Sequence, residues 1–201
     1  ECGDPGVQFD TIITDWHTCP VTGRINASNP CSEYMHLDNS ACNLASINLL
    51  KFLRDDDTFM VREFKQAVDV FILAQDIIVD GSSYPTPKIA ENARNFRQLG
   101  LGYANLGALL MTKGLPYDSA EGRAWAGALS SLMAGEAYRF SAEITRVKGP
   151  FAGFKLNRKP MLRVIGKHRK AAYAIETDLL DDKELASAAQ TVWDEALATG
   201  E

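Results

Sequence analysis

The sequence lacks the features that mark membrane, secreted and repetitive proteins. No run approaches the ~18 uninterrupted apolar residues that a membrane-spanning helix needs. The first residues carry acidic groups, and no apolar stretch follows a basic one, so no signal peptide is expected. No internal repeat or low-complexity segment is present. These absences argue against a membrane protein and predict a cytoplasmic location.

Positive charge is also in short supply. The chain has 21 Lys and Arg residues against 26 Asp and Glu residues, which gives a net charge of −5. A nucleic-acid-binding domain usually carries a basic surface, so the balance argues against DNA or RNA as a partner. Basic residues gather only at 158–170, where we expect the solvated face of a helix.

Cysteine and histidine are few and widely spaced. The four cysteines are Cys2, Cys19, Cys31 and Cys42. No Cys-x-x-Cys pair occurs, so a structural zinc site is not expected, and the thiols are expected to be reduced. The three histidines are His17, His36 and His168. They are dispersed along the chain, and the sequence predicts no metal site.

What the sequence does have is the composition of a globular domain. Of its 201 residues, 46% are hydrophobic and 23% are charged, which suits one domain with a sizeable core. Residues 1–50 are rich in turn-forming residues, and their short apolar runs at 7–13 and 44–49 predict strands joined by loops. From residue 55 the apolar spacing is helical, and aspartates 55–57 are the expected capping residues.

Glycine and aspartate divide the helical part. Gly100 and Gly102 are interpreted as close packing and the start of a helix. Asp118 and Asp181 are the expected N-caps of two helices, because each is followed by a glutamate three residues later. The expected helices cover about 64–78, 103–113, 118–147, 158–172 and 181–198, and residues 88–94 are expected to begin a helix or a turn.

One stretch carries groups that could do chemistry. Asn29, Cys31 and Glu33 alternate, so an extended segment would point all three side chains to one side. A thiol can act as a nucleophile or hydrogen-atom carrier, a carboxylate can take a proton, and an amide can bind hydroxyls. Cys42 adds a second thiol, which suggests thiol–disulfide chemistry. On these residues alone, a purely structural loop remains an alternative.

Several longer strings then point to a family. They are GDPGVQF at 3–9, WHTCP at 16–20, GRINASNPCSEY at 23–34, ACNLASINL at 41–49, RQLGLGYANLG at 97–107, GPF at 149–151 and HRKAAY at 168–173. Together they resemble the active-site region of ribonucleotide reductase large chains, in the adenosylcobalamin-dependent branch. The resemblance covers nearly the whole chain.

The resemblance implies a fold. The family has a ten-stranded α/β barrel threaded by a finger loop, and residues 24–35 would be that loop. Residues 1–201 would then be an internal part of the catalytic barrel domain. Residues 1–50 would supply strands and the finger loop, and residues 55–201 would be mainly helices.

The resemblance also implies residue roles. Cys31 would be the thiyl radical that takes the 3′ hydrogen of a ribonucleotide. Glu33 would be the general base for the 3′-hydroxyl, Asn29 would position the ribose, and Cys42 would be one redox thiol. The substrate-binding stretch would comprise Ser28, Asn29, Pro30, Cys31, Ser32 and Glu33. Neither Cys2 nor Cys19 matches the second thiol, and both are expected to be packed small side chains.

The implied cofactor is adenosylcobalamin, with contacts mostly outside this chain. The implied partners are the ribonucleotide substrate and a thioredoxin-like or other dithiol reductant, and the resemblance allows a homodimer of the full-length protein. The chain by itself is expected to be inactive. Two alternatives remain open: a reductase large chain that uses a separate radical-generating subunit, and a non-catalytic binding or assembly module that retains the fold.

Overall fold

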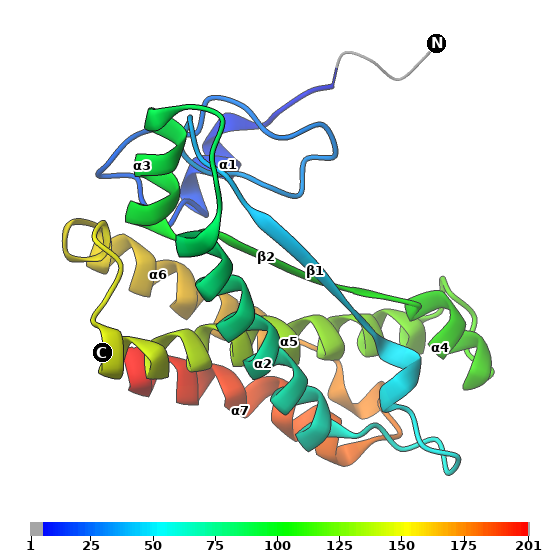
Figure 1. Cartoon of the computed structure of the whole chain (residues 1–201). Coiled ribbons are helices and arrows are strands. Elements are labelled where there is room, and N and C mark those ends of the chain that lie inside the picture. The colour runs from blue at the N-terminus through cyan, green and yellow to red at the C-terminus, as the bar shows by residue number, and fades with distance from the viewer. Residues whose placement is uncertain (1–5, 201) are drawn as a thin grey trace.

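A computed structural model describes residues 6–200 of the chain. A two-stranded sheet lies over a layer of long helices, and the loops that precede the first strand gather at one end of the molecule (Figure 1). The elements are α1 (Asp10–Asp15), β1 (Asn43–Asn48), η1 (Leu49–Phe52), α2 (Val61–Gly81), α3 (Pro87–Phe96), β2 (Leu99–Ala104), α4 (Leu106–Thr112), α5 (Ala120–Lys148), α6 (Phe154–Ala172), η2 (Thr177–Leu179) and α7 (Lys183–Gly200).

The two strands are parallel and joined through α2 and α3. Asn43 lies opposite Leu99, and Asn48 lies opposite Ala104. Ile47 of β1 is buried against the helices, whereas Leu44 on the other face is 71% exposed. Parallel sheets are normally covered on both faces. The described residues therefore cover one face of the sheet and leave the other open.

The core lies between α2, α5 and α7. Its largest buried side chains include Phe59, Phe64, Trp125 and Trp193, and the rings of Phe59 and Phe64 meet edge to face at 5.2 Å. Trp125 and Trp193 are buried in this core, whereas Trp16 is 38% exposed. This packing fixes the helix layer on which the strands rest.

A single glycine lets two of these helices approach. A Cβ at Gly135 of α5 would overlap Cγ1 of Val192 on α7 and would stand 3.2 Å from Trp193. The position is helical, so glycine is needed there for space and not for backbone conformation. The close contact of α5 with α7 thus depends on the missing side chain.

Two segments form a different type of secondary structure from the one expected. Residues 10–15, which overlap the run at 7–13 expected to be a strand, form the helix α1, with the amides of Ile12 and Ile13 bonded to the carbonyl of Phe9. Gly100 and Gly102 lie inside the strand β2 and do not start a helix. The alternation of Leu99, Leu101 and Tyr103 toward the core, which the glycines mask in the sequence, is the physical reason for the strand.

Each helix with an expected N-cap begins at a different residue from the one expected. Ser119, not Asp118, caps α5 by accepting a 2.9 Å hydrogen bond from the amide of Gly122. The first helix after residue 55 begins at Val61, and Asp56 instead accepts bonds from the turn residue Thr58. Because a cap needs the right backbone geometry and not only a carboxylate, the sequence pattern misplaced these starts by a few residues.

Asp182, and not the expected Asp181, accepts a hydrogen bond from a backbone amide at the start of α7. Its Oδ1 accepts a 2.9 Å bond from the amide of Leu185, and its Oδ2 accepts a 2.7 Å bond from the amide of Phe59. Asp181 instead contacts Lys113 and Trp125. One buried carboxylate therefore ties the start of the last helix to the segment before α2.

The basic stretch of α6 is only partly a solvated face. Arg163 and Lys167 both pair with Asp15 of α1, and Arg169 pairs with Asp194 of α7. The contacts with Asp15 hold the N-terminal segment against α6, and the contact with Asp194 joins α6 to α7. Among the helices of residues 6–200, none is long and apolar enough to cross a membrane. These residues form two strands, and a closed ten-stranded barrel is not seen in them.

Candidate functional site

The loop that carries Cys31 is a tight turn. The amide of Ser32 donates to the carbonyl of Asn29 at 3.1 Å, and Ser32 has a left-handed φ of 63°. The side-chain oxygen of Asn29 accepts a 3.0 Å bond from the amide of Tyr34. Cys31 is therefore exposed at the tip of a turn. The expected extended alternation of Asn29, Cys31 and Glu33 is wrong for this segment.

The two stems of the turn are bridged by a residue that the sequence reasoning missed. Gln8 Nε2 lies 3.3 Å from Ser28 Oγ and 3.2 Å from Ser32 Oγ, and donates to both. The two hydroxyls are themselves 3.2 Å apart. Gln8 belongs to one of the strings that carried the resemblance, but nothing in its spacing pointed to the turn. It holds the segment that presents Cys31.

Cys42 stands just before β1 and is half-buried. Its thiol donates to the carbonyl of Asn43, at 3.5 Å from sulfur to oxygen. Burial raises the pKa of the Cys42 thiol, and the negative charge of Glu33 raises it further. Glu33 and Cys42 are thus near enough to interact. Cys42 is held as a thiol, which is the form that can supply a hydrogen.

Glu33 and Cys31 are less enclosed than the resemblance implied. Glu33 is exposed, as are Pro30, Cys31 and Ser32. Ser28 and Asn29 are half-buried. The described residues bring the six candidate substrate-binding residues together on one turn without covering them. Anything that shields this turn from water must come from elsewhere.

Polar aromatic side chains pack beneath the turn. The Tyr34 hydroxyl donates to Ser40 Oγ at 2.8 Å, and burial, with smaller effects of Cys42 and Cys19, raises the pKa of Tyr34 to about 12. His36 stacks on Tyr34 with ring centroids 6.2 Å apart, and Gln98 lies 2.9 Å from its Nδ1. Burial, aided by His17, lowers the pKa of His36 to about 4. This layer is neutral at pH 7.

Two of the histidines that are dispersed along the chain lie close together in space. His17 and His36 meet edge to face at 5.6 Å, whereas His168 stacks on Trp193. His17 Nδ1 accepts the amide of Cys19, so its Nε2 carries the hydrogen that points to the carbonyl of Gly23. Within residues 6–200 no group of three or more acidic, histidine or cysteine side chains could hold a metal.

Cys19 is buried, as expected, with 2% of its surface exposed, and burial raises the pKa of its thiol. Cys2 lies outside the described residues. Cys19 lines a cavity of about 900 Å³ between the N-terminal loops and the helices α2, α5 and α6, together with Glu33, His36 and Tyr138. Cys31 and Cys42 are not part of that lining. The cavity therefore lies behind the turn and does not contain it.

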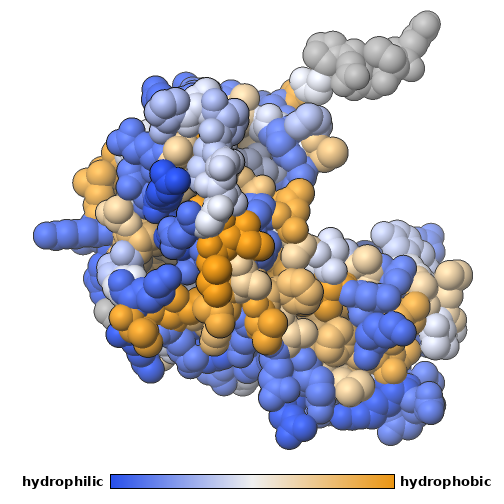
Figure 2. Space-filling view, in the orientation of Figure 1, coloured by the Kyte–Doolittle hydropathy of each residue, from blue (hydrophilic) through white to orange (hydrophobic). Residues whose placement is uncertain are grey.

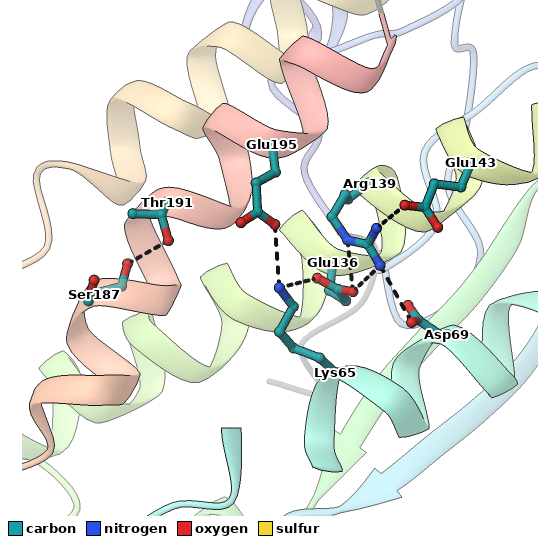
Figure 3. Close-up of polar contacts among 8 residues, drawn as sticks. All are labelled: Lys65, Asp69, Glu136, Arg139, Glu143, Ser187, Thr191 and Glu195. Carbon is teal, nitrogen blue, oxygen red and sulfur yellow. Dashed lines mark hydrogen bonds and ion pairs between the residues drawn. The ribbon is translucent and has the colours of Figure 1, made fainter. Parts of the chain in front are cut away.

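A second hollow, of about 720 Å³, lies between α2, α5 and α7 (Figure 3). Glu136 at its base is 1% exposed and pairs with Lys65 at 3.0 Å and with Arg139 at 2.5 Å. Burial, and then the charge of Glu136, raise the pKa of the nearby Asp69 to about 7. Arg139 also pairs with Glu143, and Lys65 with Glu195. The charges pair with one another across three helices, as a structural network does.

Apolar surface gathers on the face of the molecule that α2 crosses (Figure 2). The exposed apolar side chains of α2 are Val70, Phe71, Leu73, Ile77 and Ile78. Exposed apolar patches on this scale are uncommon on the surface of a complete soluble domain. This face of α2, like the open face of the sheet, lacks a covering layer among the described residues.

Comparison with known proteins identifies the relatives. The family model described as ribonucleotide reductase, barrel domain, matches residues 1–201. A vitamin B12-dependent ribonucleotide reductase of Rhodopirellula baltica is 55% identical over 200 residues, covering 100% of this chain and 19% of that protein. One of Streptomyces coelicolor is 53% identical over 205 residues, covering 100% and 21%.

A more distant relative is named a vitamin B12-dependent ribonucleoside-diphosphate reductase. It comes from Mycobacterium tuberculosis and is 36% identical over 156 residues, which cover 78% of this chain and 22% of that protein. The chain thus spans about a fifth of the length of the curated relatives it matches.

Proposed function

The chain belongs to the ribonucleotide reductase barrel-domain family, and we propose that it is the part of a vitamin B12-dependent reductase that carries the radical cysteine, the general base and one redox thiol. The activity so proposed is the reduction of ribonucleotides to 2′-deoxyribonucleotides. Residues 1–50 would contribute the finger loop, and residues 55–201 mainly the surrounding helices.

One observation carries the proposal. The turn at residues 29–32 presents Cys31 at its tip, while Glu33, directly after the turn, acts on the thiol of Cys42 through its charge. A hydrogen-atom carrier and a base therefore lie two residues apart in the chain, and the charge of that base acts on a thiol that can serve as reductant. Holding the reacting groups in a fixed arrangement removes much of the entropy cost of bringing them together.

The chemistry follows from these groups. The sulfur radical of Cys31 takes the hydrogen atom from C3′ of the ribose, and Glu33 takes the proton of the 3′-hydroxyl. The 2′-hydroxyl leaves as water with one added proton. Cys42 and a second thiol from outside this chain supply two electrons and two protons and become a disulfide. Cys31 then returns its hydrogen to C3′. In sum, one ribonucleotide and two thiols give one deoxyribonucleotide, one water and one disulfide.

Asn29 has two tasks in this scheme. Its oxygen holds the turn through the amide of Tyr34, which leaves the amide nitrogen to bind a ribose hydroxyl. Ser28 and Ser32 hold the stems of the turn through Gln8, and Pro30 stands between Asn29 and Cys31 at the exposed end. A di- or triphosphate substrate would fit this proposal equally.

Adenosylcobalamin would supply the radical that activates Cys31. The described residues suit the receiving end of that transfer, because the thiol is exposed at a turn tip. They do not form a cradle for a large planar cofactor, since neither hollow includes Cys31 in its lining. We therefore expect the residues that hold the cofactor to lie outside this chain, as does the second thiol of the scheme above.

The remaining parts of the proposal concern what surrounds the turn. A thiyl radical survives only where water and stray hydrogen donors are excluded. β1 and β2 would be two neighbouring strands of a ten-stranded barrel, whose other strands would close over the open face. The electrons would come from a thioredoxin-like or other dithiol reductant. A cytoplasmic location and a homodimer of the full-length protein complete the proposal.

The experiment is ribonucleotide reduction by a full-length protein carrying this chain, with a dithiol, in the presence and absence of adenosylcobalamin. Activity that requires the cobalamin and is abolished by Cys31→Ala is the expected result. Cys19→Ala is the matched control, because Cys19 is a buried thiol that the scheme does not use.

Other outcomes select the alternatives. Activity without cobalamin that needs a second protein would indicate a separate radical-generating subunit. Turnover that survives Cys31→Ala would refute the radical assignment. No activity under any condition, from a protein that folds and binds nucleotide, would favour a non-catalytic module.

A further inference from the structure

Gly100 of β2 lies against the thiol of Cys42. A Cβ built at Gly100 would stand 2.8 Å from Cys42 Sγ and 3.1 Å from the carbonyl oxygen of Asn43, and would overlap Cδ2 of Leu44. Real Cβ atoms essentially never come within 3.0 Å of another heavy atom, so any side chain at this position forces a neighbour to move. A strand glycine often marks such a close approach.

The backbone gives no other reason for glycine at this position. Gly100 is in an extended strand and is not among the residues with positive φ. Glycine in a strand interior weakens the strand, because it loses more conformational freedom and packs no side chain. The space that it leaves is filled by the sulfur of Cys42 and the end of Leu44.

The strands cannot separate easily to make room. Gln75 of α2, which is 2% exposed, donates from Nε2 to the carbonyl of Asn43 at 3.1 Å and to the carbonyl of Gly100 at 3.0 Å. The side chain of Asn43 donates back to the carbonyl of Gln75 at 3.1 Å. A buried amide therefore clamps the backbone on both sides of the contact, beside the sheet pairing itself.

The displacement would fall on the side chains. Leu44 is 71% exposed and can swing into solvent. Cys42 has a single side-chain torsion that places sulfur, so relieving the clash moves Sγ to a different staggered position. The thiol would leave both Gly100 and its acceptor on Asn43.

We infer that Gly100 is a positioning residue for Cys42, keeping open the space in which the redox sulfur stands. The inference rests on the proposed function for its effect on turnover, but the sulfur's position can be tested without it. The matched control is Gly102, two residues along the same strand face. A Cβ there would lie 3.8 Å from Ser46 Oγ and 3.9 Å from the carbonyl of Ala45, which is ordinary contact.

The experiment compares Gly100→Ala with Gly102→Ala in a full-length protein carrying this chain. The first readout, on reduced protein without cofactor or substrate, is the alkylation rate of Cys42 by iodoacetamide, followed by mass spectrometry. We expect faster alkylation in Gly100→Ala, because the sulfur leaves the strand it packs on, and the wild-type rate in Gly102→Ala. The second readout is turnover with a dithiol.

For turnover we expect Gly100→Ala to lower kcat on the order of 100-fold, as small misplacements of reacting groups do. KM should stay within about twofold, because the substrate-binding turn is untouched. Unchanged alkylation and turnover in a folded Gly100→Ala protein would overturn the inference. Altered alkylation with full turnover would support the positioning of Cys42 and refute its role as a redox thiol.

A second variant covers the case in which Gly100→Ala does not fold. Adding Leu44→Ala removes the overlap with Leu44 and leaves the contact with Cys42. If the double variant melts like Leu44→Ala alone yet still alkylates faster at Cys42, the displaced sulfur and not a damaged strand is the cause. A wild-type alkylation rate in the folded double variant would refute the inference.

Discussion

The side-chain oxygen of Asn29 accepts a hydrogen bond from the amide of Tyr34, 3.0 Å away, across the turn that presents Cys31. The same side chain is the proposed contact for the ribose, so its two ends serve different purposes. Asn29→Asp keeps an acceptor for Tyr34 but removes the amide donor, whereas Asn29→Ala removes both.

We therefore predict graded losses at this position. Asn29→Asp should raise KM or lower kcat while keeping the turn, and Asn29→Ala should lose on the order of 100-fold in kcat/KM because Cys31 is also misplaced. Steady-state kinetics of the full-length variants measure both. Wild-type activity of Asn29→Asp would show that the amide donor does not contact substrate, and equal losses in the two variants would show that the acceptor for Tyr34 does not position Cys31.

A second prediction concerns the charge of Glu33. Because that charge raises the pKa of the Cys42 thiol, Glu33→Gln should lower this pKa and move the pH profile of Cys42 alkylation toward lower pH. Burial, the larger cause, remains in the variant. The control is Glu91→Gln, which removes an exposed charge on α3. An unshifted profile would mean that Glu33 and Cys42 do not interact.

A third prediction concerns the buried charges between α2, α5 and α7. Asp69 has a folded pKa raised to about 7, above the usual 3.8 of an aspartate, so between these pH values the folded state holds a proton there that the unfolded state has lost. Its contribution to the free energy of unfolding is complete below about pH 4 and is lost as pH rises toward 7. Lys65, Glu136, Arg139 and Glu143 surround it.

Asp69→Asn imitates the protonated form at every pH. We predict that the variant melts at a higher temperature than the wild type at pH 8, and that this advantage shrinks by pH 5. The buried histidines titrate in both proteins and cancel in the difference. Thermal melts at both pH values check this, and a constant difference would mean that Asp69 keeps an ordinary pKa.

The contact of α5 with α7 gives a fourth prediction. Gly135→Ala places a methyl against Val192 and Trp193, and overpacking of this kind typically costs about 1–3 kcal/mol of stability. Gly166→Ala is the matched control in α6, where a Cβ meets nothing within 4 Å. There alanine should stabilise the helix by about 0.5–1 kcal/mol. Denaturant melts that place both variants on the same side of wild type would contradict this account.

How far the sequence predicts the structure differs between β1 and β2. The alternation of Leu44 and Ser46 with inward residues reveals β1, because one face is buried and the other open. β2 cannot be predicted from the sequence, because Gly100 and Gly102 occupy its outward positions. A polar residue at these positions would have produced the apolar–polar alternation of a strand. The role of Gly100 depends on Cys42, which strand pairing brings close from far along the chain.

The sequence likewise predicts some parts of the candidate site and not others. Cys31, Glu33 and Cys42 are found by residue type and by the resemblance, because thiols and carboxylates are uncommon enough to notice. The turn itself was missed, since the left-handed Ser32 and the capping by Asn29 are set by local backbone geometry. Gln8 and Gln75 were missed because amides in contact with backbone or hydroxyls have no sequence signature.

The bond between Phe59 and Asp182 sets an order of events during synthesis. The amide of Phe59 is in a buried residue, and its acceptor lies 123 residues further along the chain. At about 5–20 residues per second, a ribosome needs on the order of ten seconds to make that stretch. During this interval the Phe59 amide just before α2 lacks its acceptor. The apolar side chains of the nascent β1–α2 unit stay uncovered until α7 has been synthesised.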